Sequence, residues 1–440
     1  MIGLDIGSTT ISAVAIDAES HEERECITIK HQATQPTERA WEHIQDADRL
    51  VDQGRRIIET LSLRYGSVAG IGLTGQMHGI LYVDATGKAV SPFYTWQDRR
   101  AGVPEPDGSS LIDALNSVLQ PPIREGYGLA THLWNVRHGC VPETARWITT
   151  ISGYMAMRLT GLSTPPALHP SEAASLGFYD LKTNCQELQR LWELGGDPSM
   201  LPRVDSENDV AGYTAEGVPV FCGLGDNQAS FLGAVMDTDH DVLLNIGTGS
   251  QITRKLNHYT AGSECEIRPF TEYGYIAVGS GLCGGRAYEL LERFIRSCLG
   301  LAGKDVDSVY EQMTAILDRS TKTDLRFDTT FCGTRQMPHQ RASITNLSPN
   351  NFTAEDFVRA VLRGVVEELY SYFQELVRLS DIPIRRVYCS GNLVRLTPAI
   401  LSIVEDVFQL PAVIAPVQEE AAFGAALYAK QRKSRLECSA

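Results

Sequence analysis

One pattern of strand, small-residue turn and strand occurs twice in this chain, and it constrains the fold more than any other feature. The first copy reads IGLDIGSTTISAVAI from residue 2, and the second reads VLLNIGTGSQITRKL from residue 242. Both place a polar residue, Asp5 or Asn245, directly before Ile-Gly and hydroxyl-bearing residues directly after it. Apolar runs that flank such a turn are typical of β-hairpins. Two matched hairpins predict two related lobes, 1–231 and 232–440.

The remaining periodicities predict α/β lobes. Apolar residues recur with the helical period over 38–64, 145–161 and 354–380, and Thr353 is the expected cap of the third helix. A strand is expected at 218–225, running straight into a small-residue helix. The stretch 162–212, with Pro165, Pro166 and Pro170, is expected to be rich in loops. Strands that alternate with helices in both halves indicate α/β lobes packed side by side.

Charge and cysteine usage exclude several classes of protein. The chain has 440 residues, with 39 Lys and Arg against 54 Asp and Glu, so the net charge is −15. That charge argues against nucleic-acid and anionic-membrane partners. None of the ten cysteines lies in a CxxC pair, so a structural zinc site is not expected. The N-terminus lacks a signal-peptide pattern and no run of about 18 apolar residues occurs, so we expect a cytoplasmic location.

The two turns carry groups that suit phosphate. Small residues in a hairpin turn expose backbone N–H groups and hydroxyls, which can hold phosphate oxygens. Neither turn is a Walker A motif, because GxxxxGK[ST] does not occur. Each turn alone has an ordinary structural explanation, since Gly and Thr are common in hairpins. Two matched turns favour a shared polyphosphate. The candidate residues are Ser8, Thr9 and Thr10 in the first turn, and Gly247 and Thr248 in the second.

Two carboxylates follow apolar strand residues. Asp5 could cap its own turn, or it could face a nucleotide-bound Mg²⁺ through water. Asp226, where a strand breaks into a helix, could be an N-cap. It could instead accept the proton of a substrate hydroxyl during phosphoryl transfer.

Two further segments offer groups for a polyol. The loop 76–78, between two glycines, is expected to be an exposed polar tip. His78 there could be a general base or a metal ligand, although a hydrogen-bond donor to a polyol is the simpler interpretation. In TWQDRR, an indole beside Asp98 and Arg99 suits a sugar, with Trp96 supplying a ring face. The alternative is a surface salt bridge beside a core tryptophan.

The motifs together resemble a known family. The order DIGSTT, GQMHG, TWQDRR, GLGDNQAS, NIGTGSQ, SGN and EEAAFGAAL, over the whole chain, resembles the FGGY family of carbohydrate kinases. The resemblance implies an α/β fold of two ribonuclease-H-like (actin/Hsp70-type ATPase) lobes with a central cleft. It also implies that the first lobe binds the sugar and the first phosphate loop, and that the second lobe binds ATP.

Residue by residue, the resemblance makes Asp226 the catalytic base and places Mg²⁺ near Asp5 and Asp226. It adds nucleotide contacts at a turn and at an adenosine loop, although that loop reads Cys-Ser-Gly-Asn where the family usually has a run of glycines. The expected sugar contacts are Gln76, Met77, His78, Trp96, Asp98 and Asn227. The expected nucleotide contacts are Ser8, Thr9, Thr10, Gly247, Thr248, Gly284, Gly285, Gly391 and Asn392.

Within the family, four stretches resemble the sedoheptulokinase members: TWQDRR, GYGLATHLW, SEAASLGFYD and LGDNQAS. GQMHG is shared with xylulose kinases. The expected activity is therefore ATP- and Mg²⁺-dependent phosphorylation of a ketose primary hydroxyl, sedoheptulose to sedoheptulose 7-phosphate. The alternatives are a xylulose kinase and a non-catalytic sugar or nucleotide sensor. The expected partners are a small-molecule sugar and ATP, with no nucleic acid or membrane, and a homodimer is left open.

Overall fold

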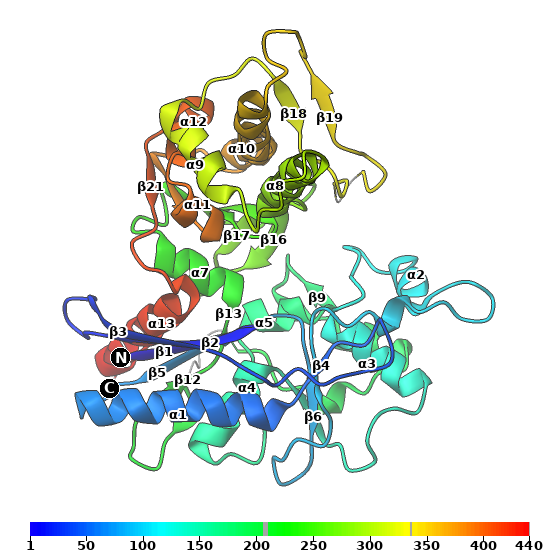
Figure 1. The fold of residues 1–440 in the computed structure, drawn as a ribbon. Coiled ribbons are helices and arrows are strands. Elements are labelled where there is room, and N and C mark those ends of the chain that lie inside the picture. The colour runs from blue at the N-terminus through cyan, green and yellow to red at the C-terminus, as the bar shows by residue number, and fades with distance from the viewer. Residues whose placement is uncertain (206–209, 335–336, 440) are drawn as a thin grey trace. The chain divides into compact units, whose positions relative to one another are not determined.

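The computed structural model describes residues 1–205, 210–334 and 337–439. The chain divides into two compact units, shown with their elements in Figure 1. Unit 1 comprises Met1–Gly233, Arg268–Tyr273 and Val417–Ala440, and unit 2 comprises Ala234–Ile267 and Gly274–Pro416. Within the ranges just given, no helix has the length and hydropathy needed to cross a membrane.

The main sheet of unit 1 is built on the first hairpin. Strands β1 (Ile2–Ile6) and β2 (Thr10–Ile16) are antiparallel, as predicted, and β5 (Ile71–Gly75) runs parallel to β1. The sheet order is β11-β12-β5-β1-β2-β3, with β13 also paired to β5. The other strands of this sheet are β3 (Glu23–Lys30), β11 (Val210–Tyr213), β12 (Pro219–Phe221) and β13 (Leu224–Gly225).

The helix expected at 38–64 begins later than predicted. Helix α1 (Ala47–Tyr65) starts after Asp46, whose side chain accepts a hydrogen bond from the Arg49 N–H. Asp46 is the N-cap of this helix and its own backbone is extended, so the helix cannot begin before residue 47. Residues Ile44–Gln45 form the short strand β4, paired with β7 (Phe93–Tyr94).

The helix expected at 145–161 is also shorter. Trp147–Thr149 is strand β8, which pairs with β6 (Leu81–Val83), and Thr150 then caps α4 (Ile151–Thr160). Helix α4 ends at left-handed Gly161, as predicted. Leu4, Leu50, Ile58, Leu73 and Met155 form part of a continuous core of sheet and helix side chains.

The stretch 162–212, apart from residues 206–209, which lie outside the described residues, contains more helix and strand than expected. It contains the short helices α5 (Pro170–Ser175) and α6 (Leu188–Glu193) and the paired strands β9 (Tyr179–Asp180) and β10 (Cys185–Gln186). Two further helices, α2 (Leu111–Asn116) and α3 (Gly128–Arg137), lie earlier in the chain.

Unit 2 repeats this arrangement. Strands β14 (Asp241–Ile246) and β15 (Ser250–Leu256) form the second predicted hairpin, and its sheet order is β16-β17-β15-β14-β20-β21. The run β17-β15-β14-β20-β21 matches β3-β2-β1-β5-β12 of unit 1 in strand order and direction. The internal repeat inferred from the two hairpins is therefore confirmed. The remaining strands are β16 (Glu266–Pro269), β17 (Tyr275–Gly281), β18 (Arg326–Asp328), β19 (Ser343–Thr345), β20 (Arg386–Ser390) and β21 (Ala412–Ile414).

The long helix of unit 2 follows the prediction. Helix α10 (Ala354–Arg378) is capped by Thr353, which accepts a hydrogen bond from the Asp356 N–H. The other helices of this unit are α8 (Gly284–Leu301), α9 (Tyr310–Arg319), α11 (Asn392–Leu396) and α12 (Ile400–Phe408).

The last helix belongs to unit 1, whereas the expected second lobe ran through residue 440. Helix α13 (Glu420–Ser439) lies beside β1 and β5, as the red helix in Figure 1 shows. The reason is a pair of strand glycines. A Cβ at Gly3 would lie 1.9 Å from the Ala422 carbonyl oxygen, and a Cβ at Gly72 would lie 2.0 Å from that of Ala425. Without those atoms the helix backbone packs directly on the sheet.

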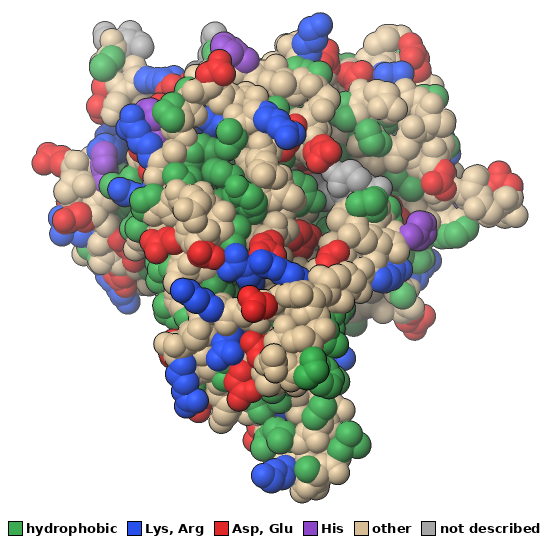
Figure 2. Space-filling model, turned by 90° about the horizontal axis from the view of Figure 1, so that it is seen from above, with side chains coloured by type: hydrophobic (Ala, Val, Ile, Leu, Met, Phe, Trp, Pro, Cys, Tyr) green, Lys and Arg blue, Asp and Glu red, His purple; other side chains and the backbone are tan. Residues whose placement is uncertain are grey.

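Figure 2 shows how charged side chains are distributed on one face of the molecule. On the face drawn in Figure 2, Lys and Arg side chains are interspersed with Asp and Glu. Opposite charges at short range also pair along the surface, as Lys255 does with Asp239 at 2.9 Å. On this face the net negative charge is therefore not gathered into a single acidic patch.

Replacing Gly72 by Ala tests the helix–sheet packing. The new methyl group would overlap backbone, which cannot rotate away, so we expect a loss of at least about 2 kcal/mol of unfolding free energy. Gly300→Ala in α8 is the control, because a Cβ there meets nothing within 4 Å. It should be neutral or stabilise by about 0.5–1 kcal/mol, since Ala favours helix. Urea unfolding checks both, and equal stability of the two variants would contradict the packing.

Candidate active site

Three parallel strand ends in unit 1 bring the first site residues together. Asp5 of β1 is in register with Thr74 of β5, and Thr74 is in register with Leu224 of β13. The chain leaves β5 at Gln76 and leaves β13 at Asp226. The carboxyl ends of parallel strands share one edge of a sheet, which is where ligands of open α/β sheets bind.

Asp5 lies at this edge in a setting that disfavours its charge. Its residue is partly buried, and its Oδ1 makes no hydrogen bond to any described residue. Burial first, and then the negative charges of Asp226 and Glu419, raise the pKa of Asp5 to about 8. Glu419, just before α13, was not anticipated, because only the folding of α13 onto unit 1 brings it here. A partly desolvated carboxylate without a cation suits a metal-bound ligand.

Asp226 is the first residue of α7 (Asp226–Ala234). Its carboxylate accepts hydrogen bonds from the backbone N–H groups of Asn227 and Met77. Burial raises the pKa of Asp226, while the charge of Arg268 and those two N–H groups oppose the rise. The contact to Asn227 is the cap-like one considered from the sequence, and the contact to Met77 ties the carboxylate to the end of β5 as well. Arg268 has no sequence signal, because it is 42 residues further along the chain.

The first phosphate turn is tightly closed. The Gly7 N–H donates to the Thr10 carbonyl at 2.9 Å, and Thr9 at the tip is exposed. The Gln45 Nε2 holds the Ser8 carbonyl at 3.0 Å, and the Trp96 indole N–H donates to the Ser8 Oγ at 2.9 Å. The turn therefore keeps Ser8, Thr9 and Thr10 at the same sheet edge as the carboxylates.

The segment 76–78 is not an exposed tip, which corrects the prediction. Gln76 and Met77 are 4% and 5% exposed. The Gln76 Nε2 donates to the Gln45 Oε1 at 2.8 Å, so Gln76 braces the phosphate turn from within. The segment is buried because Gln76 continues the strand ladder, its N–H donating to the Ile6 carbonyl.

His78 is fixed on three sides. It has a positive φ of 73°, and its N–H donates to the Ser175 Oγ at 3.1 Å. Its Nδ1 lies 2.6 Å from the Ser175 carbonyl oxygen, and its ring stacks on Tyr127 with 4.6 Å between ring centroids. A carbonyl can only accept, so the Nδ1 carries the proton. Ser175 and Tyr127 were not identified as site residues from the sequence.

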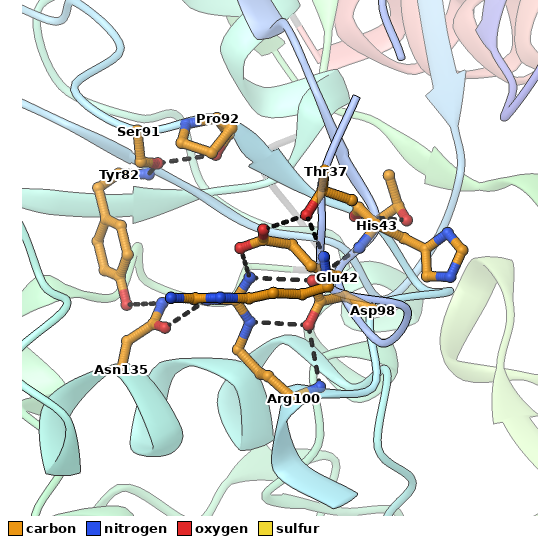
Figure 3. Close-up of polar contacts among 11 residues, drawn as sticks. Thr37, Glu42, His43, Tyr82, Ser91, Pro92, Asp98, Arg100 and Asn135 are labelled. Carbon is orange, nitrogen blue, oxygen red and sulfur yellow. Dashed lines mark hydrogen bonds and ion pairs between the residues drawn. The ribbon is translucent and has the colours of Figure 1, made fainter. Parts of the chain in front are cut away.

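Of the two residues expected at the sugar in this segment, Trp96 is accessible and Asp98 is not. Trp96 is 47% exposed, and Asp98 is fully buried. The partner of Asp98 is Arg100 and not Arg99: one carboxylate oxygen accepts from Arg100 Nε at 2.7 Å, and the other accepts from Arg100 and from the His43 N–H. Figure 3 shows both oxygens engaged. Asp98 therefore holds the 95–100 segment in place from within the protein, and Trp96 is accessible to solvent.

Arg100 is the centre of this buried cluster. Its guanidinium also bonds the Asn135 Oδ1 at 2.7 Å and the Glu42 carboxylate at 3.3 Å, as Figure 3 shows. Its Cζ lies 4.2 Å from the ring centroid of Tyr94, with Trp41 and Trp134 also within cation–π range. The planar fork of arginine satisfies all these partners, which lysine could not.

Replacing Asp98 by Asn tests this role. The buried Arg100 would lose its bidentate partner, so we expect about 3 kcal/mol less unfolding free energy. Asp239→Asn is the matched control, because its pair with Lys255 is exposed and should change stability by less than about 1 kcal/mol. Urea unfolding measures both variants. A fully stable Asp98→Asn protein would contradict this bracing role.

Helix α5 holds two of the site segments by hydrogen bonds. Ser171 Oγ accepts from the Gly225 N–H at 3.0 Å, directly before Asp226, and Ser175 holds His78. Between them, Glu172 is 4% exposed and accepts hydrogen bonds from the Thr150 and Ser152 hydroxyls. Burial raises the pKa of Glu172 to about 7, the charge of Asp226 adds to the rise, and the two hydroxyls oppose it.

Glu172 gives a pH-dependent stability with a definite sign. A raised pKa means that the folded protein binds this proton more tightly than the unfolded chain, whose value is 4.5. The linked stability is present in full below pH 4.5 and is lost as the pH rises through about 7. Relative to wild type, Glu172→Gln should therefore gain about 3 kcal/mol between pH 4 and pH 8. Unfolding curves at several pH values check this, and a constant difference would contradict it.

In unit 2 the expected nucleotide residues also gather at strand ends. Asn245 of β14 pairs with Ser390 of the parallel β20, and its Nδ2 donates to the Ser390 Oγ at 2.8 Å. The start of α8 packs on the second turn: the Gly285 N–H donates to the Gly247 carbonyl at 2.8 Å. Gly391 has φ of 94°, and a Cβ there would lie 2.4 Å from the Ile246 carbonyl oxygen. The residues brought together in unit 2 are Gly247, Thr248, Gly284, Gly285, Gly391 and Asn392.

The donor set of unit 1 fits a nucleotide-bound Mg²⁺. Mg²⁺ takes oxygen ligands, and it commonly binds through one or two carboxylates together with substrate phosphates. Asp5 offers an oxygen without a hydrogen-bond partner among the described residues, and Asp226 lies nearby. In the part of the chain described, no three His, Cys, Asp or Glu side chains are grouped to hold a metal by themselves. The site therefore suits a metal that arrives with its nucleotide.

Comparisons with known proteins give the family. Family models described as the N-terminal and C-terminal domains of the FGGY family of carbohydrate kinases match residues 1–233 and 243–430. A sedoheptulokinase of Mus musculus is 27% identical, over 98% of this chain and 97% of the relative.

Solved structures agree on the fold. The xylulose kinase from Rhodospirillum rubrum has a TM-score of 0.82 at 22% identity, covering 98% of this chain and 90% of that one. The Plasmodium falciparum glycerol kinase with ADP has a TM-score of 0.79 at 17% identity, covering 98% and 89%. The predicted pair of actin/Hsp70-type α/β lobes is confirmed. The chain belongs to the FGGY family of carbohydrate kinases.

Proposed function

We propose that this kinase transfers the γ-phosphoryl group of ATP to the primary hydroxyl of a ketose, with sedoheptulose as the preferred acceptor. The observation that carries the proposal is the position of Asp226. Its carboxylate lies at the strand edge that also holds the Ser8–Thr10 turn and Asp5, and backbone N–H groups fix its orientation. A sensor would not need a carboxylate placed and held in this way.

Asp226 would act as the general base. A base works best when its pKa approaches the working pH, and burial moves the pKa of Asp226 upward in that direction. The hydroxyl proton would pass to the carboxylate as the oxygen attacks phosphorus in line. Arg268 and the N–H groups of Asn227 and Met77 keep the carboxylate available in its charged form before transfer.

The two small-residue turns would hold phosphate oxygens. Their N–H groups and hydroxyls are dipoles fixed by the fold, so they need little reorganisation as charge develops. Ser8, Thr9 and Thr10 serve this role in unit 1, and Gly247 and Thr248 serve it in unit 2. Asp5 and Asp226 would lie near a nucleotide-bound Mg²⁺, which would supply the positive charge that the turns lack.

The acceptor is proposed from two observations. The sedoheptulokinase relative aligns over nearly the whole of both chains. The stretches GYGLATHLW and SEAASLGFYD, which resemble that group, supply Tyr127 and helix α5 beside His78. The alternative acceptor is xylulose, because GQMHG is shared with xylulose kinases. His78, Asn227 and Trp96 are the proposed contacts to either sugar.

A panel of ketoses tests the proposal. Purified protein with Mg-ATP should release ADP only in the presence of sugar, with the highest kcat/KM on sedoheptulose. A higher kcat/KM on xylulose would establish the alternative, because that ratio measures discrimination. Failure of every pentulose, hexulose and heptulose to stimulate ADP release would contradict the kinase proposal altogether.

Asp226→Asn tests the base. The amide keeps the size of the side chain but cannot take the proton, so kcat should fall by roughly 10²–10⁴-fold. Sugar affinity, measured by calorimetry, should change much less. Asp381→Asn, an exposed carboxylate in unit 2, is the control and should retain full activity. Unchanged turnover in Asp226→Asn would refute the assignment.

A further inference from the structure

One hydrogen bond joins two parts of the centre that the sequence places 88 residues apart. The Trp96 Nε1–H donates to the Ser8 Oγ at 2.9 Å. Trp96 lies in the turn proposed to bind the sugar, and Ser8 lies in the turn proposed to bind phosphate. Both belong to unit 1, so the contact lies within one compact body.

The Ser8 hydroxyl is engaged on two sides. It accepts from the indole and donates to the Gln76 Oε1 at 3.4 Å. Gln76 in turn binds Gln45, whose Nε2 holds the Ser8 carbonyl. A hydroxyl has one proton to donate, so the orientation of the Ser8 hydroxyl depends on where the indole N–H points. Moving Trp96 therefore changes what Ser8 can offer to a phosphate oxygen.

The turn that carries Trp96 has little freedom of its own. The Thr95 N–H and hydroxyl both bind the His43 carbonyl at 3.0 Å, and Asp98 is locked by Arg100. A Cβ at Gly126 would lie 1.8 Å from the Trp96 carbonyl oxygen. The backbone at Gly126 therefore packs directly against the backbone of Trp96. The part of Trp96 that can move is therefore its side chain. This residue is 47% exposed, and its indole N–H is held by Ser8.

We propose that the Trp96–Ser8 hydrogen bond couples the sugar-binding turn to the first phosphate turn, so that each holds the other in its working geometry. The inference rests on the proposed kinase function. It makes Trp96 a positioning residue for Ser8, and Ser8 a positioning residue for the sugar-facing indole. Arg100, through Asp98, is the buried brace that keeps the turn in reach.

A double-mutant cycle tests the coupling. Trp96→Phe keeps an aromatic face but removes the N–H, and Ser8→Ala removes the acceptor. Each single variant should raise the KM of both substrates, sugar and Mg-ATP, by roughly 3- to 10-fold, the effect of one neutral hydrogen bond. In the double variant the two effects should be less than multiplicative, because the shared bond is lost only once.

Three controls make the outcome decisive. Trp192→Phe removes an exposed indole from α6, 63% exposed, and should leave both KM values unchanged. Ser8→Thr restores an acceptor hydroxyl, so its effects on both KM values should be smaller than those of Ser8→Ala. Thermal unfolding should be the same for all variants, because the contact is near the surface.

The coupling is overturned if Trp96→Phe changes only the sugar KM and Ser8→Ala changes only the ATP KM, or if the two effects multiply in the double variant. Those results, with an active wild-type enzyme, leave the kinase function intact. A wild-type protein inactive on every ketose is a different failure, which removes the proposed function and the coupling together.

Discussion

Two partly buried carboxylates lie at one sheet edge of unit 1, and the groups around them must compensate their charge. Asp5 lies near the end of β1 and Asp226 directly follows β13, and both strands run parallel to β5, which lies between them. The negative charge of Asp226 adds to the burial that raises the pKa of Asp5. Two partly desolvated acids are tolerable only where backbone N–H groups, a cationic side chain or a bound metal compensates them. Asp226 is compensated by the backbone N–H groups of Asn227 and Met77 and by the positive charge of Arg268. For Asp5, the proposed function assigns this compensation to the nucleotide-bound Mg²⁺.

The same edge depends on residues far away in the sequence. Helix α13 reaches β1 and β5 only because Gly3 and Gly72 have no side chains, and its approach brings Glu419 toward Asp5. Helix α5 contributes Ser171 behind Gly225 and Ser175 behind His78. The proposed reaction centre is thus held by elements that individually carry no catalytic motif.

Much of the fold could be predicted because its signals are local. The two hairpins, the capped helix α10 and the Gly161 stop each depend on residues within a few positions. Helix α1 was placed too early because the apolar spacing before Asp46 is also compatible with a helix, and only the strand pairing of Ile44 and Gln45 decides otherwise. The location of α13 was missed because helix–sheet packing joins opposite ends of the chain.

The site divides in the same way. The residue types at 5, 8–10 and 226 indicated phosphate chemistry, and the structure gathers them at one edge. The sequence could not distinguish a ligand-facing carboxylate from a buried one, so Asp98 was expected at the sugar and lies instead on Arg100. Gln76 was expected in solvent and braces the turn through Gln45. Burial and long-range partners decide these roles.

The overall charge of −15 is no obstacle to ATP on this account. The turns offer N–H groups and hydroxyls, and the metal arrives with the nucleotide, so attraction is local. Phosphoryl transfer to the sugar can be followed most directly by ³¹P NMR of purified protein with Mg-ATP and sedoheptulose. We expect a new phosphomonoester resonance that grows with ADP. Formation of inorganic phosphate and ADP alone would contradict it, because the protein would then be a hydrolase and not a sugar kinase.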